Sequence, residues 1–152
     1  MKNPQVNPAD AQQLFMIIWA SLLISQLLFF AVVYFIRPDV VHFDLTRPLL
    51  GRDALIVLII GALAVTALVI SLFLKKKYLD QAVNGQDLGR VQTAMIIGCS
   101  LSESVSLCGL FLAISFDYSY FWLFFILGIA GTLFHFPTRK SIEAASFKSK
   151  GM

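Results

Sequence analysis

Long apolar runs separated by short polar segments make up most of the sequence. Four runs can be read, over residues 14–36, 54–74, 91–116 and 118–136. Each has roughly the 17–25 residues that an α-helix needs to cross a bilayer, and a helix pairs its own backbone polar groups in lipid. The pattern therefore predicts an all-α fold: one domain of four transmembrane helices, with connecting segments at residues 37–53 and 75–90 and a tail at 137–152.

Polar residues mark where these helices should begin and end. Asp53 directly precedes the second run and belongs to the residue types that cap helix N-termini. Only the segment from Asp117 to Tyr120 is left for a turn between the third and fourth runs. The last two helices are therefore expected to form a tight hairpin.

The composition and the distribution of charge agree with a membrane protein. The 152 residues are 58% hydrophobic and 14% charged, and a net charge of +3 gives little support to nucleic-acid binding. Nine Lys and Arg residues lie near the N-terminus, in residues 75–90 and in the tail, against three in residues 37–53. The positive-inside rule then places both termini and residues 75–90 in the cytoplasm, in the inner membrane if the protein is bacterial.

One ionisable side chain interrupts the third apolar run. Glu103 is 13 residues after Arg90 and 14 before Asp117, so a helix places it near the middle of the membrane. A charged carboxylate exposed to lipid at that depth costs several kcal/mol, so we expect Glu103 to be protonated, paired or hydrated. Such a residue is a candidate functional site by default.

Weakly polar residues lie where they could reach this carboxyl group. Helical periodicity places Ser100 and Ser106 on the same face as Glu103. Gln26 and Ser25 are the polar exceptions in the first run, and two interpretations stay open. Gln26 either forms a hydrogen bond across a helix interface or supports Glu103.

No pattern in the sequence indicates an enzyme. We find no nucleophile–base pair and no phosphate-binding loop, and we expect no catalytic residue and no cofactor. Asp39, His42 and Asp44 suggest metal ligands, but this spacing without further Cys or His is typical of a solvated loop, so no metal site is expected. His135 lies near a predicted membrane interface, where amphipathic rings collect, and needs no functional explanation.

The third run and the segment before it resemble the c subunit of F-type ATP synthases, the c-ring or proteolipid family. The resemblance covers roughly 60 residues. It rests on residues 90–98 (Arg-Val-Gln-Thr-Ala-Met-Ile-Ile-Gly), Glu103-Ser104, Gly109-Leu110 and Ala113-Ile114, and on the polar segment 83–89 (Val-Asn-Gly-Gln-Asp-Leu-Gly). It implies that the second and third helices form a c-like central hairpin whose loop is cytoplasmic.

The resemblance also implies a chemistry for Glu103. In that family the corresponding glutamate binds the travelling proton or sodium ion, and the residue matching Ser104 is a sodium ligand in sodium-driven members. With Ser100 from the same helix face, these residues form the candidate ion-binding set. Copies of the chain would assemble into a ring that turns against a stator-like membrane subunit supplying an arginine.

Small residues on the second and third helices are the candidate packing positions of such a ring. They are Gly98, Gly109, Ala64 and Ala67. Small side chains let neighbouring helices approach closely, and because these lie on two different helices, head-to-tail association into a ring is expected. The expected partners are therefore other copies of this chain and membrane lipids.

The sequence also departs from the c-subunit pattern. Residues 63–71 lack the closely spaced glycines of the family's inner helix, and Ile70 stands near the position of a sodium-binding Gln. The loop lacks the Arg-Gln-Pro triplet, and two extra helices flank the hairpin. Three functions stay open: a ring-forming subunit that carries protons through Glu103, a homo-oligomeric scaffold in which Glu103 only joins helices, and an accessory subunit of a larger transporter.

The predicted orientation can be tested by cysteine labelling. A cysteine introduced at Thr46 should react with a membrane-impermeant reagent added outside the cell, because residues 37–53 are expected to be extracytoplasmic. A cysteine at Asn84 should react only after the membrane is opened. The opposite pattern would overturn the orientation.

Overall fold

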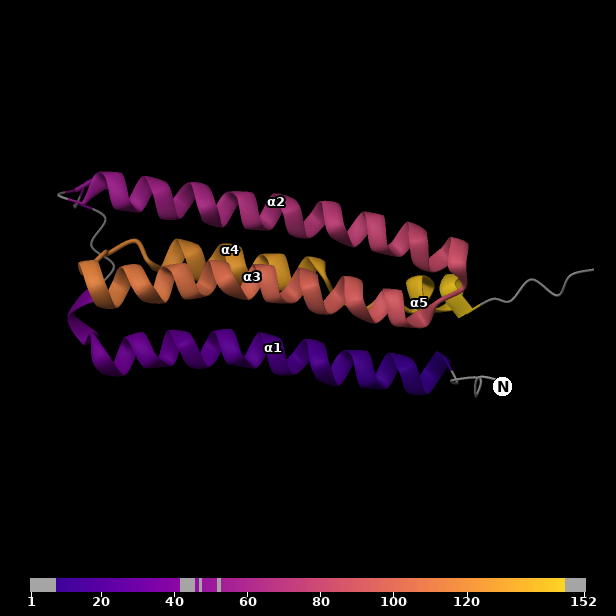
Figure 1. The fold of residues 1–152 in the computed structure, drawn as a ribbon. Helices are drawn as coiled ribbons and strands as arrows, with labels where there is room; N and C mark the ends of the chain where they lie inside the picture. The colour runs from indigo at the N-terminus through magenta and orange to yellow at the C-terminus, as the bar shows by residue number, and fades with distance from the viewer. Residues whose placement is uncertain (1–7, 42–45, 47, 52, 147–152) are drawn as a thin grey trace, which may run out of the picture.

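The computed structural model describes residues 8–41, 46, 48–51 and 53–146, and nearly all of these are helical (Figure 1). This confirms the all-α prediction. Five α-helices are described, together with a 3-10 turn, η1, at Pro38–Val40. The α-helices are α1 (Pro8–Ile36), α2 (Ala54–Gly85), α3 (Leu88–Phe116), α4 (Trp122–Phe134) and α5 (Arg139–Ser146).

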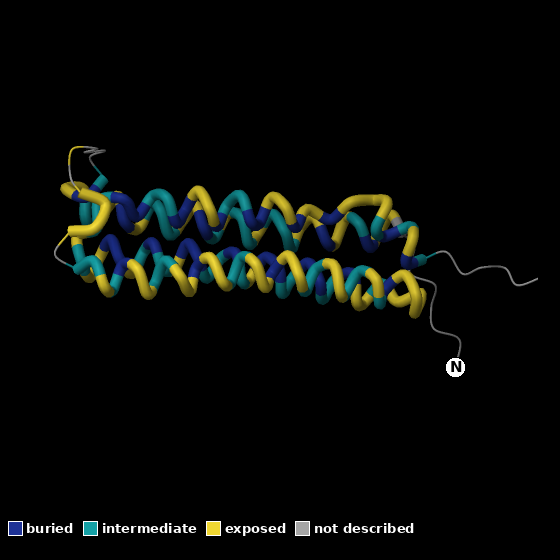
Figure 2. The backbone as a smooth tube through the Cα atoms, turned by 90° about the horizontal axis from the view of Figure 1, so that it is seen from above, coloured by how far each residue is buried: buried dark blue, intermediate teal, exposed yellow. Residues whose placement is uncertain are grey.

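Helices α1, α2 and α3 are each long and apolar enough to cross a membrane. Their outward faces carry large apolar side chains, among them Leu63, 61% exposed, and Phe73, 72% exposed. Figure 2 shows that exposed positions run along the outer sides of the long helices, whereas buried positions lie mainly where the helices face one another. Exposed side chains of this kind suit contact with lipid tails, which are themselves apolar. These three helices indicate a membrane protein.

The expected fourth spanning helix over residues 118–136 is not confirmed. Helix α4 has 13 residues and is about 20 Å long, short of a hydrocarbon core of about 30 Å. At its start, Asp117 adopts a left-handed conformation (φ 52°) and ends α3, and a turn follows before Trp122. At its other end Pro137 cannot continue a helix and disfavours helical geometry in the residue before it.

Helices α2 and α3 are joined much more tightly than expected. Residues 75–90 were predicted to connect them, but α2 continues to Gly85 and α3 begins at Leu88. Gln86 adopts a left-handed conformation (φ 48°), and the Asp87 side chain accepts a hydrogen bond from Gly89 N at 2.9 Å. Lysine is a good helix former, so the polar end of α2 extends the apolar helix beyond its hydrophobic part.

Helix α3 lies at the centre of the bundle. It packs against α1, α2, α4 and α5, and Figure 1 shows α1 and α2 on opposite sides of the α3–α4 pair. The N-terminal end of α1, the α2–α3 turn and α5 lie at one end of the bundle, and the α3–α4 turn lies at the other. The tight hairpin predicted between the last two long apolar runs is confirmed, because α4 folds back along α3.

Charged residues join the helices at the α3–α4 end. Arg37 forms an ion pair with Asp117 and donates to the backbone oxygen of Ile114 at 3.2 Å. These contacts fix the end of α1 to the end of α3. Asp53 is at the N-cap position of α2, as expected, but its side chain makes no capping hydrogen bond.

The small residues predicted to join copies of the chain pack within the chain. An added Cβ at Gly98 would overlap the ring of His135, and one at Gly109 would lie 2.8 Å from Phe124 Cβ and 2.9 Å from Phe121 O. Both glycines therefore lie against the segment containing α4. On α2, Ala64 is buried and Ala67 is partly buried, and both belong to the cluster that includes the α3 residues Val105 and Leu112.

Gly98→Ala should destabilise the fold because the new methyl group has no space beside His135. Overpacking of this kind costs about 1–3 kcal/mol. Gly61→Ala is the matched control, since nothing lies within 4 Å of its added Cβ; it should be neutral or stabilise α2 by roughly 0.5–1 kcal/mol. Thermal unfolding in mild detergent measures both. Equal behaviour of the two variants would contradict the close contact at Gly98.

Candidate functional site

Glu103 lies near the middle of α3, at the seam between α3 and α1. Its carboxyl oxygen Oε1 is in hydrogen-bond contact with the hydroxyl of Ser25, from the middle of α1. The same hydroxyl lies 2.8 Å from the backbone oxygen of Leu22, one turn earlier in α1. Ser25 thus links the carboxyl group to the backbone of the neighbouring helix.

The carboxyl group is not sealed inside the bundle. Glu103 and Ser25 are both intermediate in exposure, whereas Ser100 and Leu107, one turn to either side of Glu103 on α3, are exposed. The seam between α1 and α3 is therefore open on its outer side at the depth of the glutamate. A group arriving from the surrounding membrane could approach Glu103 without unfolding the bundle.

In the described part of the chain, neither of the predicted serine ligands forms a hydrogen bond with Glu103. The Ser104 hydroxyl donates to the backbone oxygen of Leu101 at 2.7 Å, within its own helix. Ser100 lies one turn from Glu103 and is exposed. Among the described residues, the hydroxyl group that contacts Glu103 is that of Ser25. Ser25 and Gln26 are both polar exceptions in the sequence of α1, but which of them faces Glu103 depends on the rotation of α1 about its axis, which the sequence does not give.

A second polar cluster lies in the interior at a similar depth. Gln26 is completely buried; its Nε2 donates to Thr132 Oγ1 of α4 at 2.6 Å, and its Oε1 accepts from Ser106 Oγ of α3 at 2.8 Å. This Gln26–Ser106–Thr132 network joins three helices. The interpretation of Gln26 as a hydrogen-bonding residue at a helix interface is confirmed.

A glycine on α4 makes room for this network. A Cβ at Gly128 would overlap Ser106 Oγ and would lie 2.8 Å from the backbone oxygen of Ser102 and 3.1 Å from Gln26 Oε1. The close approach of α4 to α3 brings the hydroxyl and amide groups within bonding distance. Within the described residues, every buried side-chain nitrogen and oxygen atom has a hydrogen-bond partner.

Backbone oxygens at the C-terminal end of α4 form hydrogen bonds with side chains from α1, from α2 and from the residue that follows α4. Trp19 Nε1 of α1 donates to Thr132 O at 2.8 Å, and the Lys75 ammonium of α2 donates to Phe134 O. His135 Nδ1 lies 2.7 Å from Gly131 O, and its Nε2 lies 3.3 Å from Ser71 O of α2. The last carbonyls of a helix lack partners in the helix itself, and these side chains supply them.

The His135 ring lies inside the bundle. It is 1% exposed and lies against Gly98. His135 is the C-cap residue of α4, and its ring is buried in the bundle. Its partners could not be read from spacing, because Ser71 is 64 residues away in the chain.

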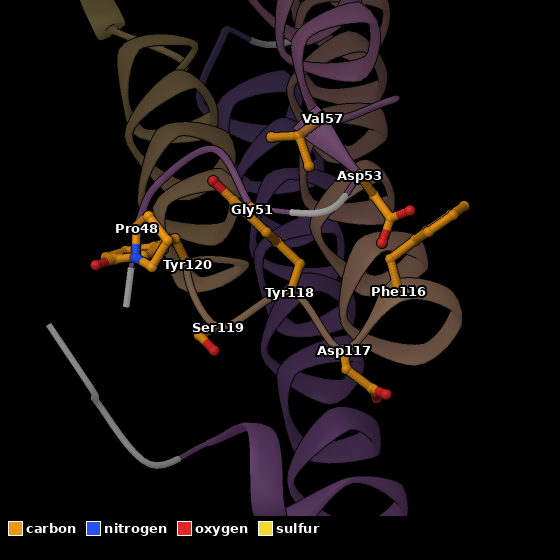
Figure 3. A pocket seen from close by; sticks show the side chains of 9 residues that line it. All are labelled: Pro48, Gly51, Asp53, Val57, Phe116, Asp117, Tyr118, Ser119 and Tyr120. Atoms are coloured by element: carbon orange, nitrogen blue, oxygen red, sulfur yellow. The ribbon is translucent and has the colours of Figure 1, made fainter. Parts of the chain in front are cut away.

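A pocket of about 230 Å³ lies at the α3–α4 end (Figure 3). Burial, with the neighbouring Tyr120, raises the pKa of the Tyr118 hydroxyl in its wall. Asp117 is held by Arg37, and Figure 3 shows its side chain extending away from Asp53. The two carboxylates do not converge, and we assign the pocket no ligand.

Metal-ligating side chains do not cluster in the described part of the chain, where no group of three or more His, Cys, Asp or Glu could hold an ion. His42 and Asp44, considered as metal ligands from the sequence, lie outside the described residues. Comparisons of this chain with protein-family models, curated proteins and solved structures find no match.

Gln26→Leu should destabilise the bundle. Leucine is similar in size to glutamine, but it cannot bond to the buried hydroxyl groups of Ser106 and Thr132, which would each lose the hydrogen bond to Gln26. A buried unpaired polar group costs about 1–3 kcal/mol. Ser21→Ala is the control on the same helix, because Ser21 is exposed and its hydroxyl group donates to the backbone oxygen of Ile17, within α1, at 2.9 Å. It should change the free energy of unfolding by less than about 0.5 kcal/mol. A similar loss in both variants would argue against a special role for the network.

Proposed function

We propose that this chain is a c-subunit-like membrane protein that binds and releases a proton at Glu103. The observation that carries the proposal is the position of the carboxyl group: near the middle of a membrane-length helix, in contact with Ser25, and beside a seam open to the outside. A carboxyl group in lipid is held neutral and can ionise only where water or a positive charge reaches it.

The hydrogen-bond geometry favours a neutral Glu103. The Ser25 hydroxyl has one proton but lies against two oxygens, those of the carboxyl group and of Leu22. The Leu22 carbonyl can only accept. A protonated Glu103 can donate to Ser25 while Ser25 donates to Leu22, so both contacts become hydrogen bonds.

Proton release needs a partner. Among the described residues of α1, α3 and α4, no Lys or Arg accompanies Glu103 at mid-helix: Arg90 and Arg37 lie near the ends of the bundle. A stator-like subunit carrying an arginine, approaching through the seam, would favour the charged form of the carboxyl group. This part of the proposal comes from the resemblance to the c subunit.

A ring of this chain would assemble through surfaces other than the small residues expected from the sequence. Gly98 and Gly109 are covered by the segment that contains α4, and Ala64 and Ala67 pack toward α3. The surfaces left for other copies are the apolar outer faces of α1 and α2. The ring proposal therefore needs contacts between α1 of one copy and α2 of the next.

A scaffold or accessory role is the second candidate. The contact between Ser25 and Glu103 joins α1 to α3, which is what an interhelical hydrogen bond in a structural protein would do. The two roles differ in one respect. A structural carboxyl group keeps its proton, whereas a carrier exchanges it with its surroundings.

Dicyclohexylcarbodiimide labelling separates them, because the reagent modifies protonated carboxyl groups in apolar surroundings. If Glu103 is a proton carrier, it should be labelled in preference to other acidic residues, and labelling should accelerate as pH falls. Added sodium should give no protection, since Ile70 stands where a sodium ligand is expected. Labelling of Glu103 that does not depend on pH would favour the scaffold.

Glu103→Gln keeps the size and hydrogen bonding of the side chain but removes the exchangeable proton. The variant should unfold at the wild-type temperature in detergent and lose the labelling. Ser25→Ala is the matched control: it keeps the carboxyl group and removes its partner, so labelling should persist. Wild-type activity of the Glu103→Gln variant in its native membrane would overturn proton transport.

A further inference from the structure

The two ends of the bundle differ in charge. At the end formed by the start of α1, the α2–α3 turn and α5, the described charged residues are Lys75, Lys76, Lys77, Arg90, Arg139 and Lys140 against Asp10, Asp80, Asp87 and Glu143. At the other end they are Arg37 against Asp39, Asp53 and Asp117. The α5 end therefore carries an excess of positive charge.

Three lysines at this end are not engaged inside the protein. Arg90 pairs with Asp87, and Arg139 pairs with Glu143. Among the described residues, Lys76, Lys77 and Lys140 are exposed and take part in no ion pair. Their charges are available to a ligand outside the chain.

Helix α4 ends at Phe134, whereas α2 continues to Gly85, and a recess is left between α2, α5 and the end of α4. We call this recess the corner. Lys75 reaches across to Phe134 O, which places this part of α2 beside the end of α4. A hollow of about 20 Å³, large enough for roughly one water molecule, lies there. Its lining includes Lys75, Phe136, Pro137, Thr138 and Ser141.

Helix geometry places Lys76 on the side of this corner and Lys77 away from it. Leu68 faces α4, because its side chain lies 2.8 Å from a Cβ built on Gly131. At about 100° per residue, Leu72 and Lys76 lie about 40° and 80° around α2 from Leu68, whereas Lys77 lies about 180° from it. Lys76 and Lys77 thus have equal charge and nearly equal depth on different faces.

Helix α5 carries a lysine next to the hollow in sequence. Ile142 and Ala145 are buried against the bundle, so Lys140 is on the outward side of this amphipathic helix. It directly precedes Ser141, which lines the hollow, and the hydroxyl groups of Thr138 and Ser141 lie 2.8 Å apart. The hollow is therefore lined by Lys75 and two hydroxyl groups, and the exposed lysines Lys76 and Lys140 directly adjoin its lining residues in sequence.

Apolar surface continues from the corner toward the middle of the bundle. Leu72 of α2 is 49% exposed and Phe134 of α4 is 69% exposed. Leu72 lies on the membrane side of the lysines, since Lys75–Lys77 directly follow the apolar part of α2, and Phe134 lies beside Lys75, which donates to its backbone oxygen. A ligand that fits the whole surface has an anionic group joined to a long apolar chain.

We propose that this corner binds an anionic phospholipid. The phosphate lies between Lys76 and Lys140 and accepts a hydrogen bond from the Thr138 hydroxyl group, which in turn accepts one from Ser141, and an acyl chain lies along Leu72 and Phe134. The apolar surface beside the cations distinguishes a lipid from free phosphate. This inference does not depend on proton binding by Glu103.

The test uses the full-length protein in detergent micelles, with thermal unfolding as the readout. Added phosphatidylglycerol should raise the unfolding temperature more than phosphatidylcholine at the same concentration, because it binds the folded state. Each lysine that is lost should weaken the apparent affinity about fivefold. Lys76→Gln and Lys140→Gln should therefore each reduce the shift, and the double variant should lose most of it.

Lys77→Gln is the matched control and should retain the wild-type shift. If it weakens binding as much as Lys76→Gln, the attraction is a diffuse effect of surface charge and the site is wrong. Glycerol phosphate, which carries the anionic group without acyl chains, should produce no shift. A full shift with glycerol phosphate would show a simple anion site and would also overturn the proposal.

Discussion

The close approach of α4 to α3 is the constraint on which the rest of the bundle depends. Glycines on both helices remove the side chains that would keep them apart, and the Gln26–Ser106–Thr132 network then closes between three helices. In an apolar environment each of these polar groups must find a partner, so the network is possible only when all three helices are in place. Packing and hydrogen bonding therefore specify the same arrangement.

The Gln26 network and the Glu103 carboxyl group lie at similar depth but differ in exposure: the network is buried, and the carboxyl group is partly exposed. Gln26 is enclosed by α3 and α4 and has all its partners within the chain, whereas Glu103 lies at the α1–α3 seam and is partly exposed. The enclosed network joins α1, α3 and α4 without any contribution from Glu103. A partly exposed carboxyl group is better placed to exchange a proton than an enclosed one.

The sequence predicts the three long helices well because a membrane-length apolar run depends only on local composition. The fourth predicted helix is present but shorter than its apolar run, because the turn after Asp117 and Pro137 limit it at its two ends, and a fourth span is not confirmed. The sequence identifies Glu103 as a candidate site. It does not show that Ser25 is the partner of Glu103, since that contact depends on how α1 and α3 are rotated toward each other. The glycines were recognised as close-packing residues, but their neighbours come from the same chain.

The apolar surfaces of α2 and α4 stop at the same level. Lys75 directly follows the apolar part of α2, and its ammonium group donates to the backbone oxygen of Phe134 at the end of α4. Beyond this level α2 continues to Gly85 as a polar helix. Because charged groups are costly in hydrocarbon, a bilayer thicker than this apolar height would have to thin beside the bundle to keep the lysines in water.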